Sequence, residues 1–166
     1  MHRFRFFGAL ESAGIWRVES SEISHIIKVL RLKEGEVVEL CDGQGTVVVG
    51  NLARVSSKEV TVSVRDEKTF PKPQKEVHLL VGVIKPSTLE QALPFLTELG
   101  VDKVSLFLQA GVDKKRISQK KIERWNQLVR GAVKQCKRLW LPQLDYYSSL
   151  ESCLEHIDNK LSKVVL

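Results

Sequence analysis

The order of apolar and polar residues changes character near residue 70 of this 166-residue chain. Before that point, short apolar stretches alternate with polar residues and turns, a pattern typical of β-strands. The expected elements are strands at 3–7, 14–18, 37–41, 46–55 and 60–64, and a short helix at 22–30. The glycine-rich turn at 42–45 favours a hairpin between two of these strands. Residues 1–70 therefore predict a small β-barrel.

Longer elements alternate after residues 71–76, whose two prolines and lack of periodicity predict a linker. The nearly unbroken apolar run at 77–84 is typical of a strand buried on both faces. The expected elements after it are a helix at 88–99, a strand at 101–108, a long helix within 113–142, a helix at 148–157 and a strand from 163 onward. This alternation predicts a parallel α/β layer in residues 77–166. Because the pattern stops inside a strand, we expect an incomplete α/β domain that continues past Leu166.

Residues 113–142 are both amphipathic and strongly basic. Apolar residues recur every three or four positions from Ile122 to Leu139, with Ser118 as the expected N-cap and Pro142 ending the pattern. The segment holds ten of the 26 Lys and Arg residues and two of the 20 Asp and Glu residues, so its net charge is +8 while that of the chain is +6. A polar face of one sign is typical of a surface that binds a polyanion. The alternative interpretation is an ordinary solvated helix face.

A second basic group occurs on the short helix expected at 22–30. His25, Lys28 and Arg31 follow one another at steps of three residues, which places them on one side of a regular helix. Ile26, Ile27 and Leu30 occupy much of the remaining face and are expected to hold the helix on the barrel. Three neighbouring basic side chains favour a second phosphate-contact site.

Composition argues against several other classes of protein. Three isolated cysteines fit neither a disulfide framework nor a zinc site and indicate a reducing, cytoplasmic location. The four histidines are scattered, so we expect no metal site. No stretch approaches the length of a membrane span. Glycine-rich nucleotide-binding loops and hydrolase motifs are absent from the sequence.

An ordered set of short motifs resembles one family along nearly the whole chain. The motifs are His25-Ile-Ile-Lys-Val-Leu-Arg31, Gly35, Leu40-Cys-Asp-Gly43, Glu98-Leu-Gly-Val101, Glu123-Arg-Trp125, Gln135-Cys-Lys-Arg138 and Pro142. Their order and spacing are similar to those of the RsmE-type 16S ribosomal RNA uridine-N3 methyltransferases. The resemblance implies a PUA-like barrel followed by a SPOUT-class α/β domain. It also implies a homodimer that uses S-adenosylmethionine and acts on ribosomal RNA or the small ribosomal subunit.

The sequence departs from this family in three places. The donor-binding motifs, a Gly-Pro-Glu-Gly-Gly loop and a Leu-Arg-x-Glu-Thr stretch, are absent from this chain. Pro94-Phe95 stands where the family commonly has Gln-Lys. Gln109-Ala110-Gly111 stands where it has Ser-Glu-Arg, which removes a Glu and an Arg from near the expected RNA cleft. We therefore assign no cofactor-binding residue and no catalytic base.

Nine basic residues and one glutamine form the predicted RNA-contact set. Its members are His25, Lys28 and Arg31 from the barrel and Lys85, Lys115, Arg116, Arg130, Lys134, Gln135 and Arg138 from the α/β part. Lys85 is included because ligands of α/β proteins bind at the carboxyl ends of strands. Two functions stay open: an S-adenosylmethionine-dependent ribosomal RNA methyltransferase, and a non-catalytic RNA-binding relative that has lost the donor site.

Overall fold

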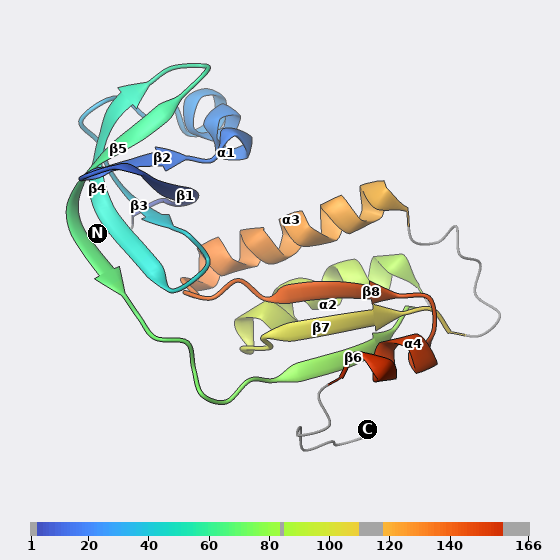
Figure 1. The fold of residues 1–166 in the computed structure, drawn as a ribbon. Coiled ribbons are helices and arrows are strands. Elements are labelled where there is room, and N and C mark those ends of the chain that lie inside the picture. The colour runs from blue at the N-terminus through green and yellow to red at the C-terminus, as the bar shows by residue number, and fades with distance from the viewer. Residues whose placement is uncertain (1–2, 84, 110–117, 158–166) are drawn as a thin grey trace. The chain divides into compact units, whose positions relative to one another are not determined.

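The computed structural model describes residues 3–83, 85–109 and 118–157, and its chain forms two compact units (Figure 1). The first unit comprises Met1–Gln74 together with Val133–Leu141. The second comprises Lys75–Ala132 together with Pro142–Leu166. The first unit therefore includes a segment from late in the chain. The long basic helix is divided between the units, because its last residues, from Val133 onward, belong to the first unit.

A closed five-stranded barrel forms the body of the first unit. Its strands are β1 (Arg5–Ser12), β2 (Ile15–Val18), β3 (Val37–Cys41), β4 (Thr46–Val55) and β5 (Val60–Thr69). They follow the order β1-β2-β5-β4-β3, and a parallel pairing of β1 with β3 closes the ring. All other pairings are antiparallel. The predicted barrel and the hairpin at 42–45 are confirmed.

Inward-facing side chains from the five strands fill the barrel. Phe6, Trp16, Leu40 and Val62 are almost fully buried and belong to one apolar cluster. Strand residues point to opposite faces in turn, so each strand supplies its core residues at every second position. The same cluster includes Ile26, which comes from the helical segment rather than from a strand.

The helical segment of the barrel consists of two short helices in direct succession. They are α1 (Ser20–Ser24) and the π-helix η1 (His25–Leu30). The predicted helix at 22–30 is therefore present, although it starts earlier and changes type at His25. A π-helix has i→i+5 hydrogen bonds and a wider turn than an α-helix. Residues three positions apart are therefore less well aligned than the regular helix assumed from sequence would make them.

The second unit is built on a parallel three-stranded sheet of order β6-β7-β8. The strands are β6 (His78–Gly82), β7 (Lys103–Phe107) and β8 (Gln143–Tyr147). The predicted α/β layer is confirmed. In this sheet β6 lies at an edge, and its five residues are half-buried rather than fully buried as the apolar run had predicted.

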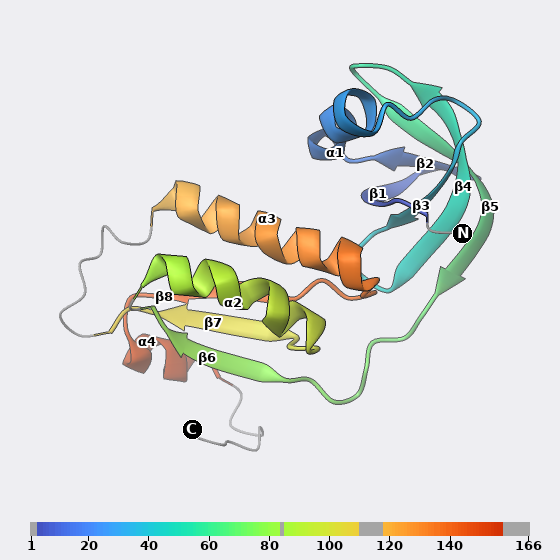
Figure 2. The same ribbon diagram turned by 180° about the vertical axis from the view of Figure 1, so that it is seen from behind.

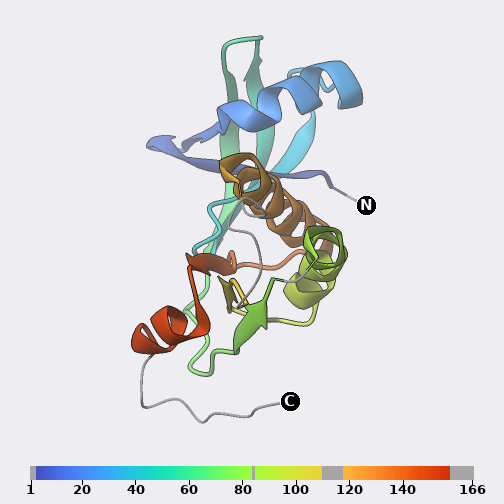
Figure 3. The ribbon, with the colours of Figure 1, turned by 90° about the vertical axis from the view of Figure 1, so that its right-hand side faces the viewer.

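Helices lie on both faces of this sheet (Figures 2 and 3). They are α2 (Pro86–Glu98), α3 (Gln119–Cys136) and α4 (Leu150–Glu155). The first two cover one face, where Trp125 of α3 stacks on Tyr146 of β8. The third covers the other face and is capped by Ser149, whose hydroxyl accepts a hydrogen bond from the Ser152 amide.

The long basic helix ends earlier than its apolar pattern predicts. It begins directly after Ser118 and stops at Cys136, where Lys137 adopts a left-handed conformation with φ 59°. Trp125, Val129 and Val133 are buried as predicted, whereas Cys136 is exposed. The pattern continued through Leu139 because the residues after the helix are also apolar, but they extend along the barrel instead.

Residues Val133–Leu141, which we call the anchor segment, are joined to the barrel by backbone hydrogen bonds. The Gly45 amide donates to the Leu139 carbonyl over 3.1 Å, and the Leu141 amide donates to the Gly43 carbonyl over 2.8 Å. Trp140 forms an isolated antiparallel bridge with Gln44. The anchor segment thus adds a short extended piece beside the turn between β3 and β4.

No helix in the described ranges is both long and apolar enough to cross a membrane.

Gly45 is predicted to be much less tolerant of alanine than Gly14. Both glycines have positive φ, 99° and 75° respectively, so a side chain is strained at either position. Around Gly14 the space is open, whereas a Cβ on Gly45 would lie 2.5 Å from the Phe70 carbonyl oxygen and 2.6 Å from the Trp140 ring. Gly14→Ala should lower the free energy of unfolding by about 1 kcal/mol and Gly45→Ala by about 3 kcal/mol.

Urea titration followed by tryptophan fluorescence measures both variants. Equal losses for Gly14→Ala and Gly45→Ala would show that the anchor segment does not pack against the turn as described.

Candidate nucleic-acid interface

Three residues of the predicted RNA-contact set lie on the helical segment of the barrel. His25, Lys28 and Arg31 are all exposed. Ile23 and Ile26 on the same segment are buried in the barrel core. Within the described part of the chain, none of the three basic side chains makes an ion pair. The apolar residues therefore hold the segment on the barrel and leave three basic groups facing solvent.

Arg31 ends η1 in a backbone conformation that normally favours glycine. Its φ is 55° and its ψ is 36°, and its amide donates to the Ile26 carbonyl. A side chain in this left-handed region costs about 1–2 kcal/mol, so glycine is the usual residue after a helix. Among the described residues, Arg31 and Lys137 are the two non-glycine residues with positive φ. The left-handed conformation of Arg31 therefore ends η1.

The end of α3 is paired with acidic residues of the barrel. The Lys134 ammonium lies 2.8 Å from each carboxylate oxygen of Glu22, whose side chain is 9% exposed. The Lys137 ammonium donates to Glu39 and to the Arg3 carbonyl, each over 3.0 Å. Both lysines of the anchor segment are therefore held by the barrel.

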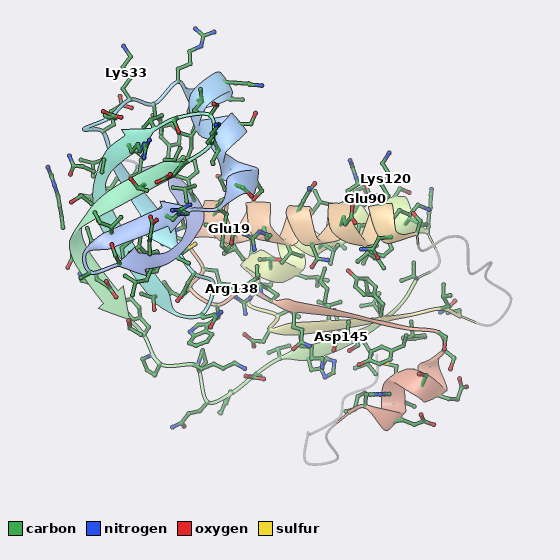
Figure 4. The ribbon with its side chains drawn as sticks, turned by 45° about the horizontal axis from the view of Figure 1, so that its top comes forward. Glu19, Lys33, Glu90, Lys120, Arg138 and Asp145 are labelled. Carbon is green, nitrogen blue, oxygen red and sulfur yellow. The ribbon has the colours of Figure 1, made fainter. Side chains whose placement is uncertain are left out.

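Glu39 of β3 receives a second basic partner from the neighbouring strand β1. The guanidinium of Arg5, a buried residue of β1, donates through Nε to the same Glu39 oxygen and through Nη1 to the Arg138 carbonyl over 2.9 Å. Figure 4 labels Arg138 just after the end of α3. Glu39 thus lies between a barrel arginine and a lysine of the anchor segment, and Arg5 also fixes the backbone of that segment.

The charge state of Glu39 follows from these contacts. Burial alone raises the pKa of this carboxyl, but hydrogen bonds from Arg5 and Lys137 outweigh burial and bring the pKa below its usual value. A lowered pKa means that the folded chain favours the ionised carboxylate. The two ion pairs therefore stabilise the first unit most at neutral pH and lose that contribution in acid.

The other predicted contact residues lie in different surroundings. Lys85 is exposed and precedes the first turn of α2, and Gln135 is exposed near the end of α3. Arg130 is half-buried, as is Arg138, and both take part in further interactions. Lys115 and Arg116 lie outside the described residues. The structure brings Lys134, Gln135 and Arg138 into the same unit as His25, Lys28 and Arg31.

Sequence reasoning missed Glu22, Glu39 and Arg5. Glu22 lies in the first turn of its helix, where acidic residues are common, and Glu39 is an outward residue of its strand. A charge in the sequence does not reveal a partner that lies about a hundred residues away. The one available signal was the alternation of β3, which places Glu39 opposite the core residues Val38 and Leu40.

The second unit has its own polar cluster on the sheet face beneath α4. Lys103 pairs with Asp145 over 2.7 Å, and the His78 ring lies 2.8 Å from the Ser105 hydroxyl. Asp145 is labelled on β8 in Figure 4. The hydrogen bond from Lys103 to Asp145 raises the pKa of Lys103, whereas burial lowers the pKa of His78. On the opposite face, burial raises the pKa of Tyr146 to about 12, so this hydroxyl stays neutral.

Neither cluster resembles a metal centre. Within the described ranges, no three His, Cys, Asp or Glu side chains come together in a way that would hold a metal ion.

Comparison with family models matches both units. A model for an RNA methyltransferase PUA domain matches residues 18–65, and a model for an RNA methyltransferase domain matches residues 71–166. The class of protein is thus an RNA methyltransferase domain preceded by a PUA domain.

Individual proteins that are similar to this chain show which kind of RNA methyltransferase it resembles. The ribosomal RNA small subunit methyltransferase E of Helicobacter pylori is 25% identical over 144 residues, which are 85% of this chain and 64% of the relative. A predicted RNA methyltransferase from Thermotoga maritima has a crystal structure with TM-score 0.76 and 25% identity, covering 89% of this chain and 67% of that one. The chain belongs to the RsmE-type RNA methyltransferases, the family its motifs resemble.

A structure with lower sequence identity supports the fold. The Neisseria gonorrhoeae ribosomal RNA small subunit methyltransferase E, solved with S-adenosylmethionine, gives a TM-score of 0.81 at 19% identity, covering 95% of this chain and 67% of that one. This chain spans less than two thirds of the length of its Helicobacter relative.

The described residues do not by themselves form a site for S-adenosylmethionine. Ligands of parallel α/β sheets bind beyond the carboxyl ends of the strands. There, the Gln109 side chain covers Gly82 so closely that a Cβ on the glycine would lie 2.6 Å from its amide nitrogen. The described residues after β6 and β7 contribute neither a glycine-rich loop nor a carboxylate for a ribose. We therefore assign no chemical step to a bound donor.

Glu39→Gln is predicted to destabilise the chain in a pH-dependent way. The change leaves Arg5 and Lys137 without their anionic partner and should lower the free energy of unfolding by about 2 kcal/mol at pH 7. Because the pKa of Glu39 is lowered by folding, the wild-type advantage is complete above about pH 5 and shrinks as the pH falls through the folded pKa.

Urea titrations at pH 7, 5, 4 and 3 measure this difference. Glu67→Gln removes an exposed carboxylate from β5 of the same barrel and should change stability by less than about 0.5 kcal/mol. A gap between wild type and Glu39→Gln that stays constant down to pH 3 would contradict the assigned pairing.

Proposed function

We propose that this chain binds 16S ribosomal RNA and belongs to an enzyme that transfers a methyl group from S-adenosylmethionine to N3 of a uridine. The observation that carries the RNA part is that His25, Lys28 and Arg31 are exposed on a firmly packed helical segment and make no ion pair with any residue that the structure describes. The family of RNA methyltransferase and PUA domains supports the reaction class. The similarity to the ribosomal RNA small subunit methyltransferase E of Helicobacter pylori supports the small-subunit RNA as substrate.

Basic side chains with no acidic partner are the ones available to phosphates. A Lys or Arg that neutralises a phosphate releases condensed counterions, which makes binding strongly salt-dependent. Lys28 and Arg31 can do this without breaking an ion pair, whereas Lys134 and Lys137 must first leave Glu22 and Glu39. The helical segment of the barrel is therefore the principal phosphate-contact site in this proposal.

The uridine itself requires a different kind of contact. N3 lies on the Watson–Crick edge, so the base has to be unpaired or flipped out before it can be methylated. Placing the nitrogen and stabilising the uridine anion would account for most of the rate enhancement. Lys85 is the described residue we propose for this part of the RNA, because it follows β6 at the carboxyl edge of the sheet.

A non-catalytic RNA-binding function is the second candidate. It is favoured by the side chain of Gln109, which packs over Gly82 where a donor site would be expected.

Methylation of 16S ribosomal RNA in cells that lack the gene distinguishes the two functions. We expect these cells to lose N3-methyluridine from 16S ribosomal RNA, as measured by mass spectrometry of nuclease digests, and to regain it with the whole gene. Unchanged methylation would support the binding function.

Removing Lys28 and Arg31 together is predicted to weaken RNA binding and its salt dependence. The double variant Lys28→Gln/Arg31→Gln should reduce the slope of log affinity against log salt by about 2, one for each lost phosphate contact. Fluorescence anisotropy with a 16S ribosomal RNA transcript at several KCl concentrations measures this slope.

Lys68→Gln provides the matched control, because Lys68 is an exposed lysine of β5 that already faces Asp66. It should leave the slope within experimental error of the wild type. If the double variant and the control behaved alike, the helical segment would not be the phosphate-contact site.

A further inference from the structure

We infer that Glu22 and Lys134 form a positioning pair for the RNA-contact helix, so that Lys134 promotes RNA binding without touching RNA. This inference rests on the proposed function, since it concerns how His25, Lys28 and Arg31 are held. It assigns a use to Glu22, a buried acidic residue of α1.

The contact between the two residues is close and symmetric. Lys134 Nζ lies 2.8 Å from Oε1 and 2.8 Å from Oε2 of Glu22. The side chains are 25% and 9% exposed, so water competes only weakly for the pair. Two hydrogen bonds to one charged carboxylate are stronger than neutral hydrogen bonds. Lys134 is thus engaged before any RNA arrives.

Glu22 is also linked directly to the contact residues. Its backbone carbonyl accepts the amide of His25, the first residue of η1 and of the contact group. Its neighbour Ile23 is buried in the barrel core. The carboxylate is therefore held by the anchor segment while the backbone of the same residue supports the start of η1.

The helical segment needs such support because it is short. It consists of five residues of α1 and six of η1. Isolated helices of this length are marginal in water, so tertiary contacts determine their position. The buried isoleucines hold one side of the segment, and the ion pair with Lys134 holds its beginning. If the pair is broken, Glu22 carries a buried charge without a partner, and the segment must shift to hydrate it.

Direct RNA contact by Lys134 is the competing explanation, and it makes the opposite prediction for Glu22. Removing a negative charge beside a phosphate-binding surface, and freeing Lys134 at the same time, should strengthen RNA binding if electrostatics alone matters. A positioning pair requires that the same removal weaken binding, because the contact helix loses its attachment.

The test uses the 166-residue chain and a fluorescent 16S ribosomal RNA transcript. Glu22→Gln and Lys134→Met should each weaken binding about five-fold, and the double variant should be no weaker than either single one. Lys134→Arg keeps the charge and the hydrogen bonds and should restore near-normal affinity. The salt slope of Lys134→Met should equal that of the wild type, whereas loss of a phosphate contact would lower it by about 1.

Tighter binding by Glu22→Gln, or a slope lowered by about 1 in Lys134→Met, would overturn the positioning role. Amide NMR spectra check the fold: in Glu22→Gln, shifts should concentrate at His25–Arg31 and spare β3 and β4. Shifts spread over the whole barrel would also overturn it. If Lys28→Gln/Arg31→Gln binds RNA as the wild type does, the proposed function fails first, independently of how Glu22→Gln behaves.

Discussion

The attachment of the anchor segment to the barrel is the contact on which the first unit depends. Two acidic side chains, Glu22 and Glu39, receive two lysines, while Arg5 donates to the Arg138 carbonyl. Two backbone hydrogen bonds and the buried cluster of Phe7, Cys41 and Val133 complete the attachment. Polar and apolar contacts thus act at the same place. A segment more than fifty residues away in sequence becomes part of the barrel's fold.

Because of this attachment, the basic residues of the first unit fall into two groups, those paired with acidic residues and those left exposed. The lysines of the anchor segment neutralise acidic residues of the barrel, so they contribute to structure. The basic residues of η1 have no such partners within the described ranges and remain available for a polyanion. A net charge of +6 therefore says little by itself about how strongly RNA is bound. The location of each acidic residue decides which basic groups can reach a phosphate.

The sequence allowed the layers of the fold to be predicted but not the contacts that position the candidate site. Alternation and turn residues located β3 and β4 to the residue, and the stripe from Trp125 to Val133 identified the buried side of α3. The end of α3 was misplaced because Trp140 and Leu141 are apolar for another reason: they pack beside the glycines of the turn between β3 and β4. Ion pairs between distant residues leave no local pattern, so Lys134 looked like a free cation.

Amide hydrogen exchange at Gly45 and Leu141, followed by NMR, tests the central claim most directly. Both amides donate across the junction between the barrel and the anchor segment. If the anchor segment is part of the barrel fold, these amides should exchange as slowly as those paired between β3 and β4, because opening them requires the same unfolding event. Exchange as fast as that of an exposed loop would show that the segment is not attached, and would contradict this account.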